Sequence, residues 1–180
     1  SFNPQKRRDL SIAFVPENRL GHSAVPELTL SENILLSQFP NNNFSKHGIL
    51  KNTLINEHAN KVIKNFKVVT PGFDAKASSL SGGNLQKFVI GREILSQPKL
   101  LIISHPTWGI DAGAEHAIRE SLIRLSKNGT SIIVLSQDLD ELIEITHRIA
   151  VIFEGKLSKP LNTKEVDISK LGLLMGGKNE

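Results

Sequence analysis

The stretch from Ser79 to Lys87 combines residue types that can hold an anion. Within it, Ser81 is followed by Gly82 and Gly83, and an amphipathic helical pattern begins at once. Glycine lets the backbone approach a bulky group, and the first turn of a helix offers unpaired N–H groups and the positive end of its dipole. These residues predict a phosphate-facing corner made of one hydroxyl and several backbone donors. On these residues alone, a plain turn with a serine helix cap is the alternative.

The elements after this corner alternate between helix and strand. Apolar residues share one face of a helix that Pro98 ends, namely Leu85, Phe88, Val89 and Leu95. Apolar runs predict strands at 100–104, 131–135 and 149–153, and further helices lie between them, marked by Ile118, Leu122 and Leu125 and by Leu139, Leu142 and Ile143. Strands alternating with helices predict βαβ units and a parallel sheet covered on both faces.

The first half of the chain predicts one strand and then a mainly helical block. The strand at 10–15 ends at Pro16, which lacks a backbone donor. Thr29 and Glu32 fit a capping box, which predicts a helix through 33–37. A polar break at 40–43 precedes a second helix over 50–66. The first eight residues are polar and are expected to form a loop.

The order of corner, helix, strand and the Gly109-Ile110-Asp111 turn resembles the ATP-binding cassette (ABC) family, where these parts are the signature motif, its helix, the Walker B strand and the D-loop. The resemblance is closest to the second nucleotide-binding domain of double-cassette subunits that drive bacterial importers of simple sugars and nucleosides, which have Asn at the position of Asn84. It reaches the C-terminus. It implies an α/β P-loop NTPase (RecA-like) fold in a partial domain over 1–180, with a helical subdomain at 29–96, a parallel-sheet core at 97–157 and a C-terminal tail at 158–180.

The family's phosphate loop, G-x-x-x-x-G-K-[ST], is not matched. Residues 172–179 come near, but Asn179 replaces the hydroxyl residue and no strand leads in, so a flexible tail is expected. The resemblance therefore implies an N-terminally truncated domain, with roughly 50 to 70 residues before Ser1. It also implies a gap between the strands at 131–135 and 149–153, filled by rearrangement, domain swapping or a symmetry mate.

The catalytic positions that the resemblance assigns are altered. Family members end the Walker B strand in Asp and Glu, which hold Mg²⁺ and polarise the attacking water. Ser104 and His105 align with them here, and Gln137 aligns with the switch histidine. A histidine near phosphate tends to protonate and lose its role as a base. Hydrolysis on this side is expected to be slow or absent, and the chain alone is expected to be inactive.

Other nucleotide-binding positions are intact. The resemblance assigns Ser81, Gly82, Gly83 and Asn84 to the signature and Asp111 to the D-loop, and a signature contacts ATP held by the opposite cassette. Glu17 takes the Q-loop position, where a carboxylate can bind Mg²⁺ or its water; an exposed loop carboxylate is the alternative. ATP and Mg²⁺ are the implied cofactors of the complete transporter, and the histidines show no metal-ligand spacing.

Composition narrows the classes of partner and compartment. The chain has 180 residues, no cysteine and a net charge of +4 spread along its length, with Lys6-Arg7-Arg8 as its only basic run. No apolar run reaches the roughly 18 residues of a membrane helix, and no signal peptide is visible. We expect a soluble protein that does not bind nucleic acid.

The implied partners are a first cassette, expected on the same polypeptide, and transmembrane permease subunits. The domain itself is expected to be peripheral, at the cytoplasmic face of the inner (cell) membrane. Two alternatives stay open. A non-transport ABC-type ATPase of the DNA-repair class would need heptad coiled coils and a basic groove. In a nucleotide-independent interaction domain, the motifs with the altered residues Ser104, His105 and Gln137 would be relics without a function.

Overall fold

The computed structural model describes residues 3–39 and 44–177 and divides into two compact units, Ser1–Leu135 and Ser136–Glu180. Each unit is described by itself. The polar break predicted at 40–43 lies outside the described residues. The predicted subdomain limits at 96/97 and 157/158 stay predictions.

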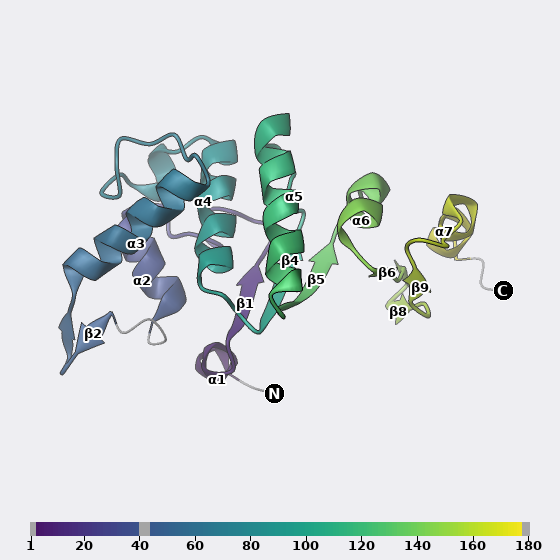
Figure 1. Ribbon diagram of the computed structural model, residues 1–180, viewed down its shortest axis with the longest axis horizontal. Coiled ribbons are helices and arrows are strands. Elements are labelled where there is room, and N and C mark those ends of the chain that lie inside the picture. The colour runs from purple at the N-terminus through teal and green to yellow at the C-terminus, as the bar shows by residue number, and fades with distance from the viewer. Residues whose placement is uncertain (1–2, 40–43, 178–180) are drawn as a thin grey trace. The chain divides into compact units, whose positions relative to one another are not determined.

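A three-stranded parallel sheet forms the centre of the first unit (Figure 1). Its strands are β1 (Ile12–Val15), β4 (Leu100–Ser104) and β5 (Ser131–Leu135), in the order β1-β4-β5. Residues Phe14, Ile102 and Ile133 pair across the three strands. The α/β fold with a parallel sheet is therefore confirmed. Among the described residues β5 pairs on one side only, and the predicted strand beyond it stays a prediction.

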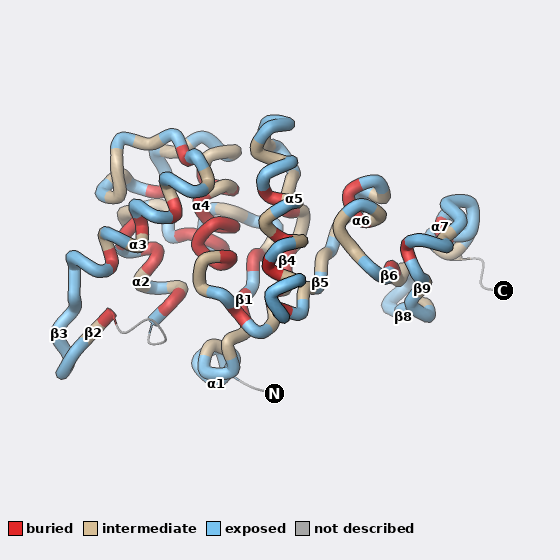
Figure 2. Tube along the Cα trace, viewed as in Figure 1, coloured by how far each residue is buried: buried red, intermediate tan, exposed pale blue. Residues whose placement is uncertain are grey.

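Two helices, α4 (Gly82–Leu95) and α5 (Ala112–Lys127), lie side by side on one face of the sheet (Figure 1). Helix α4 is buried along nearly its whole length, and Figure 2 shows it as an almost continuous buried segment. The core on this face is apolar and mostly aliphatic, and it includes Ala13, Val15, Leu101, Ile103, Phe88, Ile118 and Leu122. Burying these side chains is the main favourable term for this unit.

The opposite face of the sheet corrects the expectation that both faces are covered. Phe14 is 58% exposed, Ile133 is 51% exposed and Leu135 is 42% exposed. Strand side chains alternate between faces, so these residues share the face away from α4 and α5. Helices α4 and α5 cover only one face, and the apolar character of a strand does not by itself show whether both of its faces are covered.

The helical block contains α2 (Leu30–Gln38), α3 (Asn52–Asn65) and the short 3₁₀ helix η1 (Ala77–Ser79), with α2 and α3 packed together and α3 against α4. The predicted capping box is confirmed, because Thr29 Oγ1 accepts from the N–H of Glu32 at 3.2 Å and the carboxylate of Glu32 accepts from the N–H of Thr29 at 2.8 Å. A small hairpin, β2 (Ser45–Lys46) and β3 (Ile49–Leu50), precedes α3.

The expectation of a loop at the N-terminus is wrong, because residues Pro4–Asp9 form helix α1. Asn3 caps it through a 2.8 Å bond from the N–H of Lys6, and proline at the first helical position has no N–H to leave unpaired. The basic residues of the last turn stabilise the helix, because their positive charges lie near the negative end of its dipole. Local capping signals therefore outweigh the polar composition that suggested a loop.

The second unit corrects the strand predicted at 149–153. That stretch forms two short strands, β6 (Arg148–Ile149) and β7 (Ile152–Phe153), which pair antiparallel with β9 (Leu161–Asn162) and β8 (Lys156–Leu157). Gly155, at a φ of +74°, turns β7 into β8. Local hairpin pairing takes the place of the parallel partner that the apolar run suggested. Helices α6 (Leu139–Ile145) and α7 (Ile168–Met175) complete this unit. Across residues 3–39 and 44–177, no helix has both the length and the apolar character to cross a membrane.

Candidate nucleotide-facing site

The signature corner, defined here as Ser81, Gly82 and Gly83, lies at the N-terminus of α4, at the end of the sheet where β1 and β4 finish (Figure 1). Ser81 is the N-cap residue and, like Gly82, is exposed, while Gly83 is half-buried. The Ser81 hydroxyl accepts a hydrogen bond from the N–H of Asn84 at 3.4 Å. The corner is therefore open to an incoming group, and α4 directs the N–H groups of its first turn toward it.

Asn84 contacts its own chain on both sides. Its Nδ2 donates to Ser81 Oγ at 2.9 Å, and its Oδ1 accepts from the N–H of Val69 at 2.9 Å. In this structure the asparagine fixes the rotamer of the Ser81 hydroxyl and ties the corner to the loop after α3. A direct role of Asn84 in binding nucleotide stays a prediction.

The D-loop, defined here as Trp108–Asp111, packs against the corner. A Cβ added at Gly83 would lie 3.2 Å from the carbonyl oxygen of Gly109 and 3.8 Å from Ile110. Glycine at position 83 therefore lets the two loops approach closely. The structure thus brings together two segments that the sequence separates by a helix and a strand.

Asp111 has two structural partners. It caps α5 by accepting from the N–H of Ala114 at 3.0 Å, and its Oδ2 lies 2.7 Å from Nζ of Lys87. The bond from Lys87 is the main reason that the pKa of Asp111 is lowered, and the bond from Ala114 adds to it. Sequence reasoning missed Lys87; its place one turn after Gly83 on α4 was the available signal.

A charge-removing variant tests this ion pair. Because the pKa of Asp111 is depressed in the folded chain, the pair is complete at neutral pH and is lost as the pH falls through that lowered pKa. We expect Lys87→Met to raise the pKa of Asp111 toward its ordinary value, measured by NMR titration of the side-chain carboxyl. Glu32 is the internal control, because its pKa is lowered by bonds from the backbone and hydroxyl of Thr29. An unchanged Asp111 titration would contradict the ion pair.

Arg19 is a second residue that sequence reasoning missed. It follows β1 in the loop that begins at Pro16, and its guanidinium donates to the carbonyl oxygen of Trp108. Burial lowers the pKa of Arg19. Atom Nη1 lies 2.8 Å from the place where a Cβ on Gly82 would stand. No local pattern marks this contact, since 89 residues separate Arg19 from Trp108.

Glu17 lies in the same loop and is exposed. Asp111, the carboxylate of the D-loop, already has Lys87 and Ala114 as partners. No group of three or more His, Asp or Glu side chains in the described ranges is arranged to hold a metal ion. These residues do not by themselves form the octahedral oxygen site that Mg²⁺ demands.

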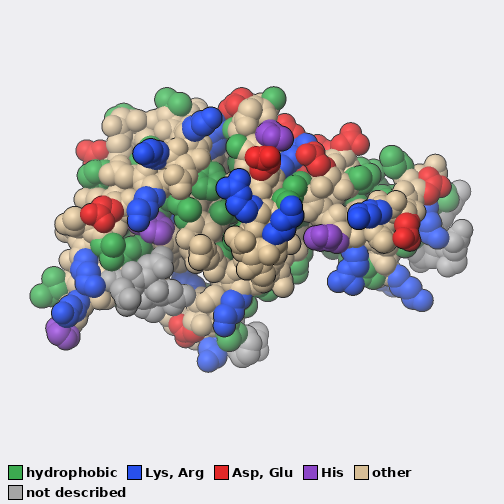
Figure 3. Space-filling model, in the orientation of Figure 1, with side chains coloured by type: hydrophobic (Ala, Val, Ile, Leu, Met, Phe, Trp, Pro, Cys, Tyr) green, Lys and Arg blue, Asp and Glu red, His purple; other side chains and the backbone are tan. Residues whose placement is uncertain are grey.

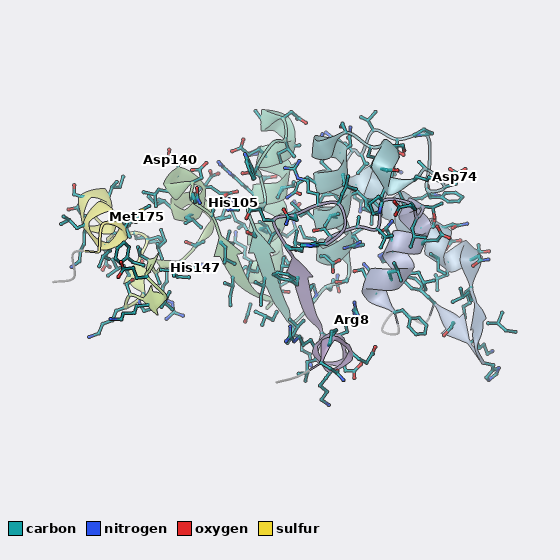
Figure 4. All side chains as sticks on the ribbon, turned by 180° about the vertical axis from the view of Figure 1, so that it is seen from behind. Arg8, Asp74, His105, Asp140, His147 and Met175 are labelled. Atoms are coloured by element: carbon teal, nitrogen blue, oxygen red, sulfur yellow. The ribbon has the colours of Figure 1, made fainter. Side chains whose placement is uncertain are left out.

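His105 follows β4 and adopts a left-handed backbone conformation with a φ of +46°. Its N–H donates to the carbonyl oxygen of Leu135 at 2.8 Å, and its own carbonyl accepts from Nε2 of Gln86 at 3.3 Å. The imidazole is half-buried, with its centroid 5.8 Å from the ring of Trp108. The backbone of His105, labelled in Figure 4, is thus hydrogen-bonded to the end of β5 directly after β4 ends.

Gln137, the other predicted catalytic residue, is exposed and belongs to the second unit. Its role at the switch position stays a prediction.

A separate pocket of about 380 Å³ lies beside β1. Its lining comes from α1, β1, the loop at 21–25, α2 and α4, and includes Arg8, Phe14, His22, Val25, Leu36 and Glu93. Figure 4, seen from behind, places Arg8 below β1, at the opposite end of the sheet from the signature corner. Mixed apolar and charged walls of this kind suit a protein segment as well as a small molecule.

A buried polar network forms one wall of this pocket. Arg92 Nε lies 2.7 Å from Oε1 of Glu93, and the other guanidinium nitrogens donate to the carbonyls of Asn33 at 3.3 Å and Ser23 at 2.9 Å. Glu93 also accepts from the hydroxyl of Ser37 at 2.5 Å. Each charge is thus paired and hydrogen-bonded, as burial requires. The network joins the loop after β1 to α2 and α4.

Comparisons with known proteins give relatives of this chain and solved structures with the same fold. No family model matches the chain. It is 40% identical over 176 residues to the nucleoside import ATP-binding protein NupA of Lactococcus lactis, covering 98% of this chain and 35% of that protein. It is 37% identical over 180 residues to the guanosine import ATP-binding protein NupO of Bacillus subtilis, covering all of this chain and 35% of that protein.

A relative named for sugar import and a solved structure extend the comparison. The galactose/methyl galactoside import ATP-binding protein MglA of Sodalis glossinidius is 38% identical over 159 residues, which cover 88% of this chain and 31% of that protein. The chain therefore spans about a third of the length of these relatives. The ATP-binding cassette MJ0796, solved as a dimer bound to ADP and phosphate, has the same fold, with a TM-score of 0.74 and 21% identity over 91% of this chain and 68% of that one. Over nearly its whole length the chain is therefore similar to one part of import ATP-binding proteins, and its fold is that of an ATP-binding cassette.

Proposed function

We propose that this chain is the energy-coupling part of an ABC importer for simple sugars or nucleosides. The names of its relatives support this class, since they are ATP-binding proteins for the import of nucleosides, guanosine and galactose or methyl galactoside. In this proposal the chain is peripheral at the cytoplasmic face of the membrane and acts with permease subunits and with a first cassette on the same polypeptide. Because the chain spans about a third of the length of these relatives, the location and the partners are proposed for a longer protein of which this chain would be one part.

The signature corner is proposed to complete an ATP site on the first cassette. One observation carries this proposal: Ser81 and Gly82 are exposed at the head of α4, directly beside the D-loop. A hydroxyl and the backbone N–H groups of the first helical turn suit a terminal phosphate, because hydrogen bonds to an anion are short and strong. Donors fixed before the nucleotide arrives require little reorganisation.

This chain's own half of the paired sites is proposed to be degenerate. The end of β4 supplies the Ser104 hydroxyl and the His105 imidazole where family members carry two carboxylates. Phosphoryl transfer depends on positioned charge and metal ions, and the described residues here do not hold a magnesium ion by themselves. ATP and Mg²⁺ are therefore assigned to the partner cassette's loop.

The pocket beside β1 is proposed as the place where a permease segment docks. Its rim exposes the apolar side chains of Phe14, Val25 and Leu36, and its floor holds the Arg92–Glu93 pair. A short amphipathic helix with one polar anchor would match these walls. Movement of the helical block would then be transmitted to the permease.

Association with an intact cassette tests the proposal. The partner is a recombinant cassette that carries its own G-x-x-x-x-G-K-[ST] loop, and binding is measured by sedimentation velocity with ATP, with ADP and without nucleotide. We expect a complex with ATP only and no hydrolysis by this chain alone. Turnover by the repurified chain that disappears in His105→Ala would overturn the degenerate half-site.

Two alternatives give different outcomes in the same experiment. A nucleotide-independent interaction domain, suggested by Ser104 and His105, predicts equal binding with and without ATP. A DNA-directed ATPase predicts salt-sensitive binding to duplex DNA. Basic and acidic side chains are interspersed on the face of the first unit seen in Figure 3, which gives that class no support there.

A further inference from the structure

We infer that Arg19 is a positioning residue that fastens the D-loop to the signature corner and links both to the loop lining the pocket beside β1. The geometric part of this inference is independent of the proposed function. Its consequence for nucleotide-dependent association rests on that function.

The guanidinium of Arg19 occupies the space between two glycines. It donates to the carbonyl oxygen of Trp108. A Cβ at Gly82 would lie 2.8 Å from Nη1, and a Cβ at Gly109 would lie 3.1 Å from Nη2. Any larger residue at either position would meet the guanidinium. These glycines therefore have a structural reason beyond letting a phosphate approach: they leave room for an arginine that bridges the two loops.

The backbone of Arg19 connects this bridge to the pocket. Its carbonyl oxygen accepts from the N–H of Ser23 at 3.0 Å and from the N–H of Ala24 at 2.9 Å, and both of these residues line the pocket. The carbonyl of Ser23 in turn accepts from the buried guanidinium of Arg92 at 2.9 Å. One hydrogen-bonded turn thus has the pocket on one side and the signature corner on the other.

This arrangement gives Arg19 a role in communication between the two sites. A partner that moves the loop at 21–25 also moves the guanidinium, and with it the D-loop carbonyl. This contact couples the pocket beside β1 to the signature corner, because the loop that carries Arg19 contacts both of them. Removing the side chain is expected to loosen the D-loop while leaving the sheet and its helices folded, because Arg19 lies outside every helix and strand.

Trp108 supplies a specific probe, because it is the only tryptophan of the chain. Time-resolved fluorescence anisotropy is measured on the full chain and on Arg19→Ala, Arg19→Lys and the exposed control Arg124→Ala. In Arg19→Ala we expect the amplitude of the fast local rotation of Trp108 to rise about twofold. Arg19→Lys, which keeps a charged donor, is expected to recover part of the difference, and Arg124→Ala is expected to match the wild type.

Binding to the ATP-loaded intact cassette is measured in parallel. We expect Arg19→Ala to weaken it about tenfold, the order of magnitude of one hydrogen bond to a charged group. Anisotropy in Arg19→Ala equal to the wild type, with an unchanged far-ultraviolet circular dichroism spectrum, overturns the positioning role. If Arg19→Ala does not fold, the same comparison is decided with Arg19→Lys and Arg19→Gln. A wild type that binds no cassette refutes the proposed function, while the anisotropy still decides the contact. Equal binding by wild type and Arg19→Ala overturns the link to nucleotide.

Discussion

Replacing Ser81 with arginine is expected to reduce ATP-dependent association with an intact cassette by at least about 100-fold, which corresponds to about 2.7 kcal/mol. The new side chain would fill the exposed corner where a terminal phosphate is proposed to bind. It would also remove the hydroxyl that accepts from Asn84 and place a cation at the positive end of α4. Isothermal titration with the ATP-loaded cassette measures the loss.

Ser78 provides the matched control for this substitution. It is exposed and lies three residues before Ser81, outside the corner. Ser78→Arg adds the same charge and bulk and is expected to bind within about twofold of the wild type, as surface substitutions generally change little. Ser81→Arg binding as well as Ser78→Arg would contradict the assignment of the corner. Thermal unfolding of both variants separates lost binding from the weaker helix cap.

Replacing Arg92 with alanine is expected to lower the free energy of unfolding by about 3–5 kcal/mol, the usual cost of breaking a buried ion pair. The side chains of Arg92 and Glu93 are only 5% and 7% exposed. Loss of the guanidinium leaves the carboxylate of Glu93 with the hydroxyl of Ser37 but without its cation. Urea denaturation followed by circular dichroism measures the change.

A double substitution distinguishes the buried charge from lost packing. Arg92→Met with Glu93→Leu removes both charges and keeps most of the volume, so it is expected to be more stable than Arg92→Ala. Arg124→Ala, at an exposed position of α5, is expected to change the free energy of unfolding by less than about 1 kcal/mol. A loss in Arg92→Ala no larger than that of Arg124→Ala would show that the network contributes little.

Much of the first unit could be predicted from sequence because its signals are local. The capping box at Thr29, the apolar face of α4 and the apolar runs of β4 and β5 lie within single elements. The uncovered sheet face at Phe14 and Ile133 could not be predicted, because an apolar strand does not show whether its second face has a helix over it. The stretch at 149–153 failed for a related reason: its apolar run fits a short hairpin as well as a central strand.

The candidate site divides in the same way. Ser81 and Gly82 could be recognised because a helix-capping serine and glycines stand out in a linear pattern, and Asp111 was assigned by the family resemblance. Arg19 could not be recognised, since it acts through a partner 89 residues along the chain. Lys87 was missed although it lies one turn after Gly83, because isolated basic residues on helix surfaces are common. Long-range contacts of this kind appear only when the fold brings the loops together.

The central claim is that the signature corner grips a phosphate presented by another cassette. It is tested most directly by a structure of this chain bound to a hydrolysis-deficient, ATP-loaded cassette. We predict that the Ser81 hydroxyl and the Gly83 N–H lie within hydrogen-bond distance, roughly 2.7–3.2 Å, of oxygens on the terminal phosphate. A complex in which that phosphate lies elsewhere, with the corner facing solvent, would contradict the account.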